Sequence, residues 1–106
     1  MPKLPISIPQ KELEDFCLRW KIQELALFGS VLRPDFRSDS DIDLLVTFRP
    51  DAAWSLFDRV DMIDELQKLF GRKVDFVNKR GIEQSRNIFR KKEILQTAEI
   101  IYAKAA

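Results

Sequence analysis

The stretch Asp41–Phe48, which reads DIDLLVTF, is the part of the sequence that most clearly predicts a strand. Its side chains alternate, so four apolar ones share one face and the other face carries Asp41, Asp43, Leu45 and Thr47. The two carboxylates point to the same side and lie ~6.6 Å apart along the strand. Like charges this close on a partly buried face repel each other, and they are stable when a cation lies between them.

A divalent metal ion is a suitable cation for this face. Mg²⁺ takes oxygen ligands, usually one or two carboxylates together with substrate phosphates. Asp75 is likewise a carboxylate within an otherwise apolar strand, which is predicted at Lys73–Asn78. Its side chain faces away from its apolar neighbours. If the two strands are adjacent, three carboxylates converge. The alternative is that an aspartate at the start of a strand caps or solvates an edge, which is sufficient for Asp41 but explains Asp43 poorly.

A second motif precedes this strand. The apolar stretch Glu24–Phe28 reads as a buried strand, and it stops at Gly29-Ser30. A strand that breaks at Gly-Ser leaves backbone N–H groups and a hydroxyl at a tight bend, which favours binding of phosphate. The dipeptide alone is weak evidence. The specific signal is the combination of an apolar strand, Gly-Ser, about ten polar residues and Asp-x-Asp opening an apolar strand.

The remaining elements follow from hydrophobic spacing. An extended lead-in at 1–8 precedes a helix with Leu13, Phe16, Cys17 and Trp20 on one face. Further helices are predicted over Trp54–Phe70, with Leu56 and Val60 on its apolar face and Gly71 as C-cap, and over Glu83–Gln96, and a last strand over Glu99–Tyr102. Two strands joined by a loop and followed by crossover helices imply an α/β (α+β) fold with a mixed sheet and helices packed on one side.

Composition narrows the possible chemistry. The chain has 106 residues, 45% hydrophobic and 33% charged, which suits one globular domain over 1–106. It contains no histidine, so histidine-based acid–base chemistry and histidine-ligated zinc are excluded. The single cysteine, Cys17, cannot form an intrachain disulfide and is expected to be a buried small hydrophobe rather than a nucleophile.

Charge and hydropathy indicate a cytoplasmic protein with no membrane contact. No run approaches the ~18 apolar residues of a membrane span. The formal net charge is +1, which does not predict a nucleic-acid binder. The segment Lys79–Lys92 holds six bases and one acid, and the segment Asp51–Glu65 five acids and one base. We interpret these as two solvated helix faces of opposite sign.

Together these residues resemble a known family. Phe28-Gly29-Ser30, Arg33 and Ser40–Val46 are similar to the signature of the minimal nucleotidyltransferases of the DNA polymerase-β superfamily, and Lys73–Val77 is similar to the strand that bears their third carboxylate. The resemblance covers roughly Glu24–Tyr102 and implies a polymerase-β-like fold with a mostly antiparallel sheet. One departure is visible: the family often has Arg-Gly where this chain has Arg33-Pro34.

The resemblance implies a role for each motif residue. Gly29-Ser30 would hold the β- and γ-phosphates of ATP, and Arg33 would lie near the triphosphate unless it is simply an exposed loop residue. Asp41 and Asp43 would bind two Mg²⁺ ions. Asp75 would complete one metal site and help take the proton from the attacking hydroxyl. The two ions would stabilise an in-line displacement at the α-phosphate.

The short chain points to one subgroup within the resemblance. After Tyr102 only a four-residue tail follows, and the stand-alone antitoxin-type members are similar in length. Those proteins are paired with a HEPN-domain ribonuclease toxin, so the implied reaction transfers AMP from ATP to a tyrosine of the toxin. Two alternatives stay open: a catalytically silent module that neutralises a partner by contact, against which the intact Asp41, Asp43 and Asp75 argue, and a nucleic-acid binder using Lys79–Lys92, whose one aromatic, Phe89, is expected in the core.

Overall fold

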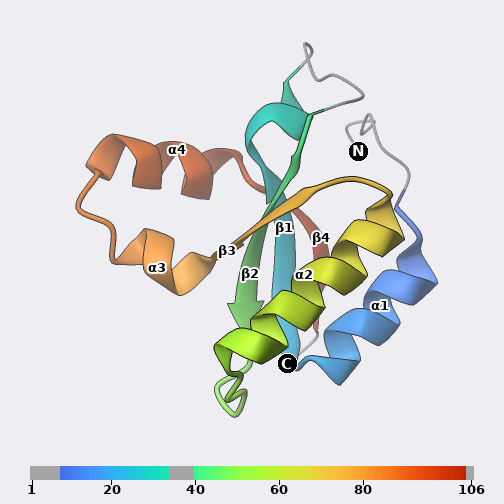
Figure 1. Cartoon of the computed structure of the whole chain (residues 1–106). Helices are drawn as coiled ribbons and strands as arrows, with labels where there is room; N and C mark the ends of the chain where they lie inside the picture. The colour runs from blue at the N-terminus through green and yellow to red at the C-terminus, as the bar shows by residue number, and fades with distance from the viewer. Residues whose placement is uncertain (1–7, 34–39, 105–106) are drawn as a thin grey trace.

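A computed structural model describes residues 8–33 and 40–104 of the chain, which form a four-stranded sheet with helices (Figure 1). The elements are α1 (Gln10–Arg19), β1 (Ile22–Phe28), the 3₁₀ turn η1 (Gly29–Leu32), β2 (Ile42–Phe48), α2 (Leu56–Phe70), β3 (Val74–Asn78), α3 (Lys79–Glu83), α4 (Ile88–Thr97) and β4 (Glu99–Ala103). The strand order is β3-β2-β1-β4, and only β2 and β3 are parallel. The predicted mixed, mostly antiparallel sheet is therefore confirmed. The lead-in, apart from Ile8, and Pro34 lie outside the described residues.

The two central strands are apolar on both faces, which determines how the sheet is covered. Along β2, Ile42, Leu44 and Val46 point into the main core, and Leu45 points to the opposite face. The antiparallel register of β1 and β2 pairs Ala26 with Leu45, so β1 follows the same alternation. Because both faces of these strands are buried, both need to be covered by helices.

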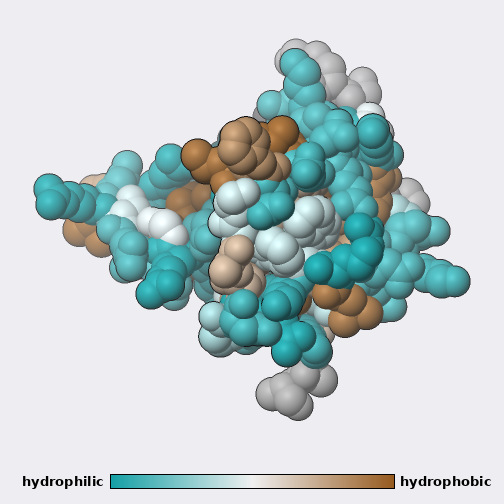
Figure 2. All heavy atoms as spheres, turned by 60° about the horizontal axis from the view of Figure 1, so that its bottom comes forward, coloured by the Kyte–Doolittle hydropathy of each residue, from teal (hydrophilic) through white to brown (hydrophobic). Residues whose placement is uncertain are grey.

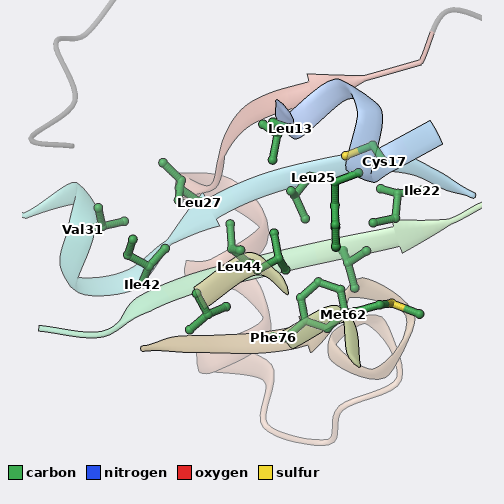
Figure 3. Packing of buried hydrophobic residues seen from close by; sticks show 14 residues of the cluster. Leu13, Cys17, Ile22, Leu25, Leu27, Val31, Ile42, Leu44, Met62 and Phe76 are labelled. Carbon is green, nitrogen blue, oxygen red and sulfur yellow. The ribbon is translucent and has the colours of Figure 1, made fainter. Parts of the chain in front are cut away.

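The main core lies between one face of the sheet and helices α1 and α2 (Figure 3). Helix α1 buries three side chains at helical spacing, as the sequence predicts, namely Leu13, Phe16 and Cys17. Burial, together with the nearby Glu14 carboxylate, raises the pKa of the Cys17 thiol to about 12. The thiol is therefore protonated at neutral pH and packs as a small apolar group, which confirms its expected place in the core.

The second face of the sheet is covered by α3 and α4, so the expectation of helices on one side only is wrong. Ile82 of α3 and Ile94 of α4 pack with Ala26, Phe28 and Leu45. In Figure 1 these two helices project to the left of the sheet, away from α1 and α2. The physical reason is that Ala26, Phe28 and Leu45 form an apolar second face of the central strands, which a one-sided arrangement would leave in water.

The predicted helix over Glu83–Gln96 begins later than expected, at Ile88, and a separate short helix precedes it over Lys79–Glu83. Helix α3 ends at Glu83, and α4 begins at Ile88 after the side chain of Asn87 accepts a hydrogen bond of 3.1 Å from the Arg90 backbone N–H. Such a cap starts a new helix rather than continuing one. Phe89, expected in the core, is 86% exposed because α4 turns only its Ile94 side toward the sheet. That expectation is also wrong.

Helix α2 begins and ends on the residues that cap it. Ser55 and Asp58 form a reciprocal capping box, so the helix starts at Leu56, two residues later than predicted. Gly71, with a φ of 69°, is the expected C-cap. The buried positions are Met62 and Leu66, whereas the predicted apolar positions at the start of the helix are exposed. Of the helices described in 8–33 and 40–104, none has the length and apolar character needed to cross a membrane.

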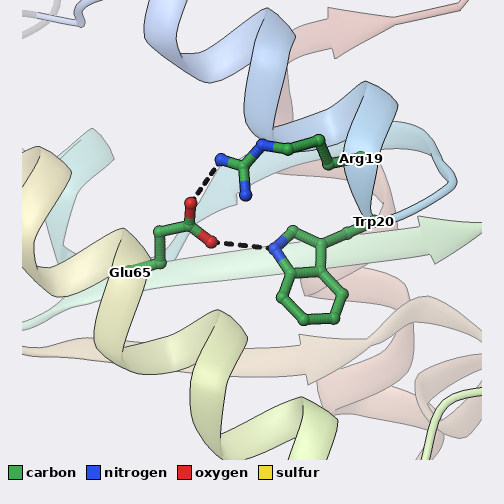
Figure 4. Close-up of polar contacts among 3 residues, drawn as sticks. All are labelled: Arg19, Trp20 and Glu65. Atoms are coloured by element: carbon green, nitrogen blue, oxygen red, sulfur yellow. Dashed lines mark hydrogen bonds and ion pairs between the residues drawn. The ribbon is translucent and has the colours of Figure 1, made fainter.

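A polar contact joins the two helices that cover the main core (Figure 4). Glu65 of α2 accepts hydrogen bonds from the guanidinium of Arg19 and from the indole N–H of Trp20, the latter at 2.8 Å. Desolvation acts to raise the pKa of Glu65, but the two hydrogen bonds and the Arg19 charge outweigh it and hold the pKa below its ordinary value. The ionised form of Glu65 therefore stabilises the fold.

We predict that Glu65→Gln lowers the melting temperature at neutral pH and that this deficit shrinks in acid. A carboxylate with a depressed folded pKa contributes stability above its unfolded pKa, about 4.3, and that contribution is lost as the pH falls through the folded pKa. Thermal unfolding of both proteins between pH 7 and pH 3 measures the gap. A gap that is the same at every pH would show that the charge of Glu65 contributes nothing.

Candidate active site

The bend at the end of β1 requires a glycine for two independent reasons. Gly29 has a φ of 75°, in the left-handed region that L side chains rarely adopt. A Cβ built on Gly29 would also lie 2.3 Å from Oδ2 of Asp43. The Asp43 carboxylate therefore rests against the backbone of the bend, and the chain turns directly from β1 into η1, which the buried Val31 anchors in the core.

The register of the sheet places the aspartates. Asp43 pairs with Phe28 of β1 on one side and with Asp75 of β3 on the other. Neighbouring strands lie ~4.8 Å apart, and residues in register point to the same face. Asp43 is half-buried and Asp75 is exposed, and Asp41 is exposed immediately before β2. The two aspartate-bearing strands are therefore adjacent, and Asp43 contacts the Gly29 bend on one side and lies in register with Asp75 on the other.

The three carboxylates as placed are not a preformed metal cage. Within residues 8–33 and 40–104, no three acidic or cysteine side chains are close enough together to hold one metal ion. The donor set nevertheless suits Mg²⁺, which usually takes one or two carboxylates and completes its shell with waters and substrate phosphates. The Asp43 carboxylate occupies the side of Gly29 where a Cβ would lie, so the glycine is what lets that carboxylate approach the backbone of the bend.

A cleft adjoins this bend between η1 and α4. Its volume is about 320 Å³, and its lining includes Gly29, Arg33, Arg90, Glu93 and Ile94. Arg33 is exposed and lies 3.8 Å from the Glu93 carboxylate, an exposed ion pair that contributes little to stability. The cleft thus presents two guanidinium groups beside the glycine bend, which favours an anionic ligand.

Arg33, which the sequence places near the triphosphate, lines this cleft, and so does Arg90, which the sequence analysis did not select. Arg90 belongs to the basic run Lys79–Lys92, for which a solvated face is the sequence-based interpretation. Arg90 reaches the cleft only because α4 packs through Ile94 onto the sheet face that also bears Asp43. The structure places Ser30 in η1, next to Gly29.

Comparison with known proteins identifies the family. The family model described as the nucleotidyltransferase domain matches residues 10–99. The chain belongs to the nucleotidyltransferase domain family. The protein adenylyltransferase MntA of Thermococcus cleftensis is 34% identical over 78 residues, which are 74% of each chain.

Two solved structures share the nucleotidyltransferase domain fold. A crystal structure described as a toxin–antitoxin with AMP-PNP has a TM-score of 0.67 at 17% identity and covers 92% of this chain and 75% of that one. A structure of a tri-AMPylated Shewanella oneidensis HEPN toxin in complex with its MNT antitoxin has a TM-score of 0.58 at 18% identity, covering 90% and 70%. At these identities the two structures show the fold alone.

We predict that Gly29→Ala destabilises the nucleotidyltransferase domain and displaces Asp43. A non-glycine residue in the left-handed region costs roughly 1–2 kcal/mol, and the new Cβ would overlap the Asp43 carboxylate. Each ~1 kcal/mol lowers the melting temperature of such a domain by ~4–8 °C. Gly81→Ala is the matched control, because a Cβ at Gly81 meets nothing within 4 Å. Equal melting temperatures for the two variants would contradict the crowded bend.

Repulsion between the paired aspartates gives a further prediction. Like charges directly opposite on neighbouring strands cost roughly 0.2–1 kcal/mol, so Asp75→Asn should melt at a higher temperature than wild type in EDTA. Asp61→Asn, an exposed aspartate on α2, should not. Circular dichroism melts of the three proteins measure the difference. If neither variant changes the melting temperature, Asp43 and Asp75 do not repel each other measurably.

Proposed function

We propose that this chain transfers AMP from ATP to a tyrosine hydroxyl of a HEPN-domain ribonuclease toxin in the cytoplasm and thereby acts as its antitoxin. The observation that carries the proposal is the register that sets Asp43 beside Asp75 against the Gly29 bend. Two further findings support it: a relative at 34% identity is named a protein adenylyltransferase, and a chain of the same fold is an antitoxin bound to a tri-AMPylated HEPN toxin.

The proposed reaction is a displacement at the α-phosphorus of ATP. The tyrosine oxygen forms a bond to that phosphorus, the bond from it to the bridging oxygen breaks, and pyrophosphate leaves. Asp75, exposed at the site, would accept the hydroxyl proton. The backbone N–H groups at Gly29-Ser30 would hold the β- and γ-phosphates, and the guanidinium groups of Arg33 and Arg90 would attract the triphosphate into the cleft.

Mg²⁺ is the metal that this donor set would hold, through Asp41 and Asp43 with Asp75 beside them. When bound, two such ions would supply charge neutralisation for the phosphates during the displacement. The protein's own contribution is then largely positioning, which a rigid sheet with residues in fixed register does well. A small scaffold is sufficient for this task.

We predict that Asp43→Asn reduces AMP transfer by at least about 100-fold, the loss typical of removing one key electrostatic group, while the chain stays folded. The assay measures transfer of label from α-labelled ATP to the HEPN-domain protein with Mg²⁺, with circular dichroism as the folding control. Asp61→Asn should transfer at the wild-type rate. Transfer by Asp43→Asn at the wild-type rate would remove Asp43 from the mechanism. Neutralisation of the toxin by wild type without ATP would favour a silent antitoxin.

A further inference from the structure

A second cavity lies at the other end of β2 from Asp43. Its volume is about 590 Å³, and it is lined by the end of β2, the segment 49–56, the start of α2 and residues of β3 and α3. Strand β2 has seven residues, so at ~3.4 Å per residue the two ends are separated by about 20 Å. An occupant of this cavity would therefore leave the candidate active site open.

The cavity is suited to an anionic group. Its lining includes Arg49, Arg59 and Arg80 but a single acid, Glu83. Arg59 is held in place because its guanidinium donates to the Phe76 carbonyl and lies over the Phe76 ring, 5.3 Å from the centroid.

The lining also contains the other two guanidinium groups and the Thr47 side chain. Arg49 lies 3.7 Å from Asp51, and no ion pair involves Arg80 within residues 8–33 and 40–104. Thr47 also lines the cavity, and its hydroxyl oxygen is buried without a hydrogen-bond partner in that part of the chain. Three guanidinium groups and a hydroxyl that share one cavity offer hydrogen-bond donors to an anionic group such as a carboxylate.

An exposed apolar patch borders the same cavity. Leu56, Phe57 and Val60, on the first two turns of α2, are 79%, 84% and 64% exposed, and Leu56 also lines the cavity. Figure 2, which brings the lower end of Figure 1 forward, shows apolar side chains gathered over the start of this helix. A contiguous apolar patch with a polar rim marks a protein-interaction site more often than a random surface.

We propose that this α2 docking surface, formed by Leu56, Phe57, Val60, Arg59 and Arg80, binds the acceptor protein through a segment whose apolar side chains flank a carboxylate. The inference rests on the proposed function, because it assigns the surface to the same partner. A small anion would cover the cavity but leave Phe57 in water. A two-fold contact between copies of this chain would bring two sets of arginines together.

The remoteness of the α2 docking surface gives it a distinct role. Thr47 in the cavity lining lies four positions after Asp43 on β2, ~14 Å away at ~3.4 Å per residue, so docking and chemistry would use different residues. Loss of docking should then raise the KM for the acceptor protein and leave kcat unchanged at saturation, since no group at the reacting atoms is altered.

The test compares two equally exposed phenylalanines. Phe57 is 84% and Phe89 of α4 is 86% exposed, so Phe57→Ser and Phe89→Ser remove the same group from different surfaces without disturbing the core. The probe is a HEPN-domain ribonuclease, the acceptor named in the proposed function, and calorimetry measures its Kd. We expect Phe57→Ser and Arg80→Glu each to raise the Kd about tenfold or more, and Phe89→Ser to leave it within about twofold.

The outcomes separate this inference from the proposed function. If wild type binds the ribonuclease but transfers no AMP, the proposed function fails, and the Kd values of the variants alone decide on the docking surface. If AMP is transferred and Phe57→Ser has an unchanged Kd and KM, the docking inference is wrong and the function stands.

Binding lost in Phe89→Ser instead would move the interface to α4. Self-association of wild type that Phe57→Ser abolishes would show a contact between copies and overturn the inference, as would no binding by wild type.

Discussion

The close approach of the Asp43 carboxylate to the Gly29 backbone is the constraint on which the site depends. It exists because β1 and β2 pair in the register that sets Phe28 opposite Asp43, and that register is fixed by apolar residues on both faces of the two strands. A slip by one residue would turn Asp43 into the main core and Leu44 out of it. The register that packs the core correctly is therefore also the register that places the Asp43 carboxylate at the bend.

The same argument extends to the third strand. β3 lies parallel to β2, with Asp43 beside Asp75, and its Val74 and Phe76 enter the main core. Those two buried side chains hold β3 in this register, because a slip would expose them to water. Apolar burial on one face of β3 thus determines which carboxylates lie side by side on the other.

Much of this could be predicted from the sequence, and the failures share a cause. The alternation of side chains along β2 predicts correctly which residues share a face, because the side-chain period of a strand depends only on local geometry. Which side of the sheet a later helix covers depends on long-range packing, so α3 and α4 were placed wrongly and Arg90 was missed. The exposed positions of Leu56, Val60 and Phe89 were missed for a related reason: helical spacing identifies apolar residues that share a face, but it does not show whether that face meets this chain or another.

The two ends of β2 consequently have different physical characters. At its start the strand carries carboxylates beside a glycine bend, and at its end it runs into a cavity lined by arginines. A group-transfer enzyme with a protein as acceptor needs both a site for the phosphates and a surface that holds the acceptor. A rigid central strand fixes the distance between the two, because its hydrogen bonds to β1 and β3 prevent it from stretching or turning. An acceptor bound at the arginine-lined end of β2 would then present its hydroxyl at a fixed distance from Asp43.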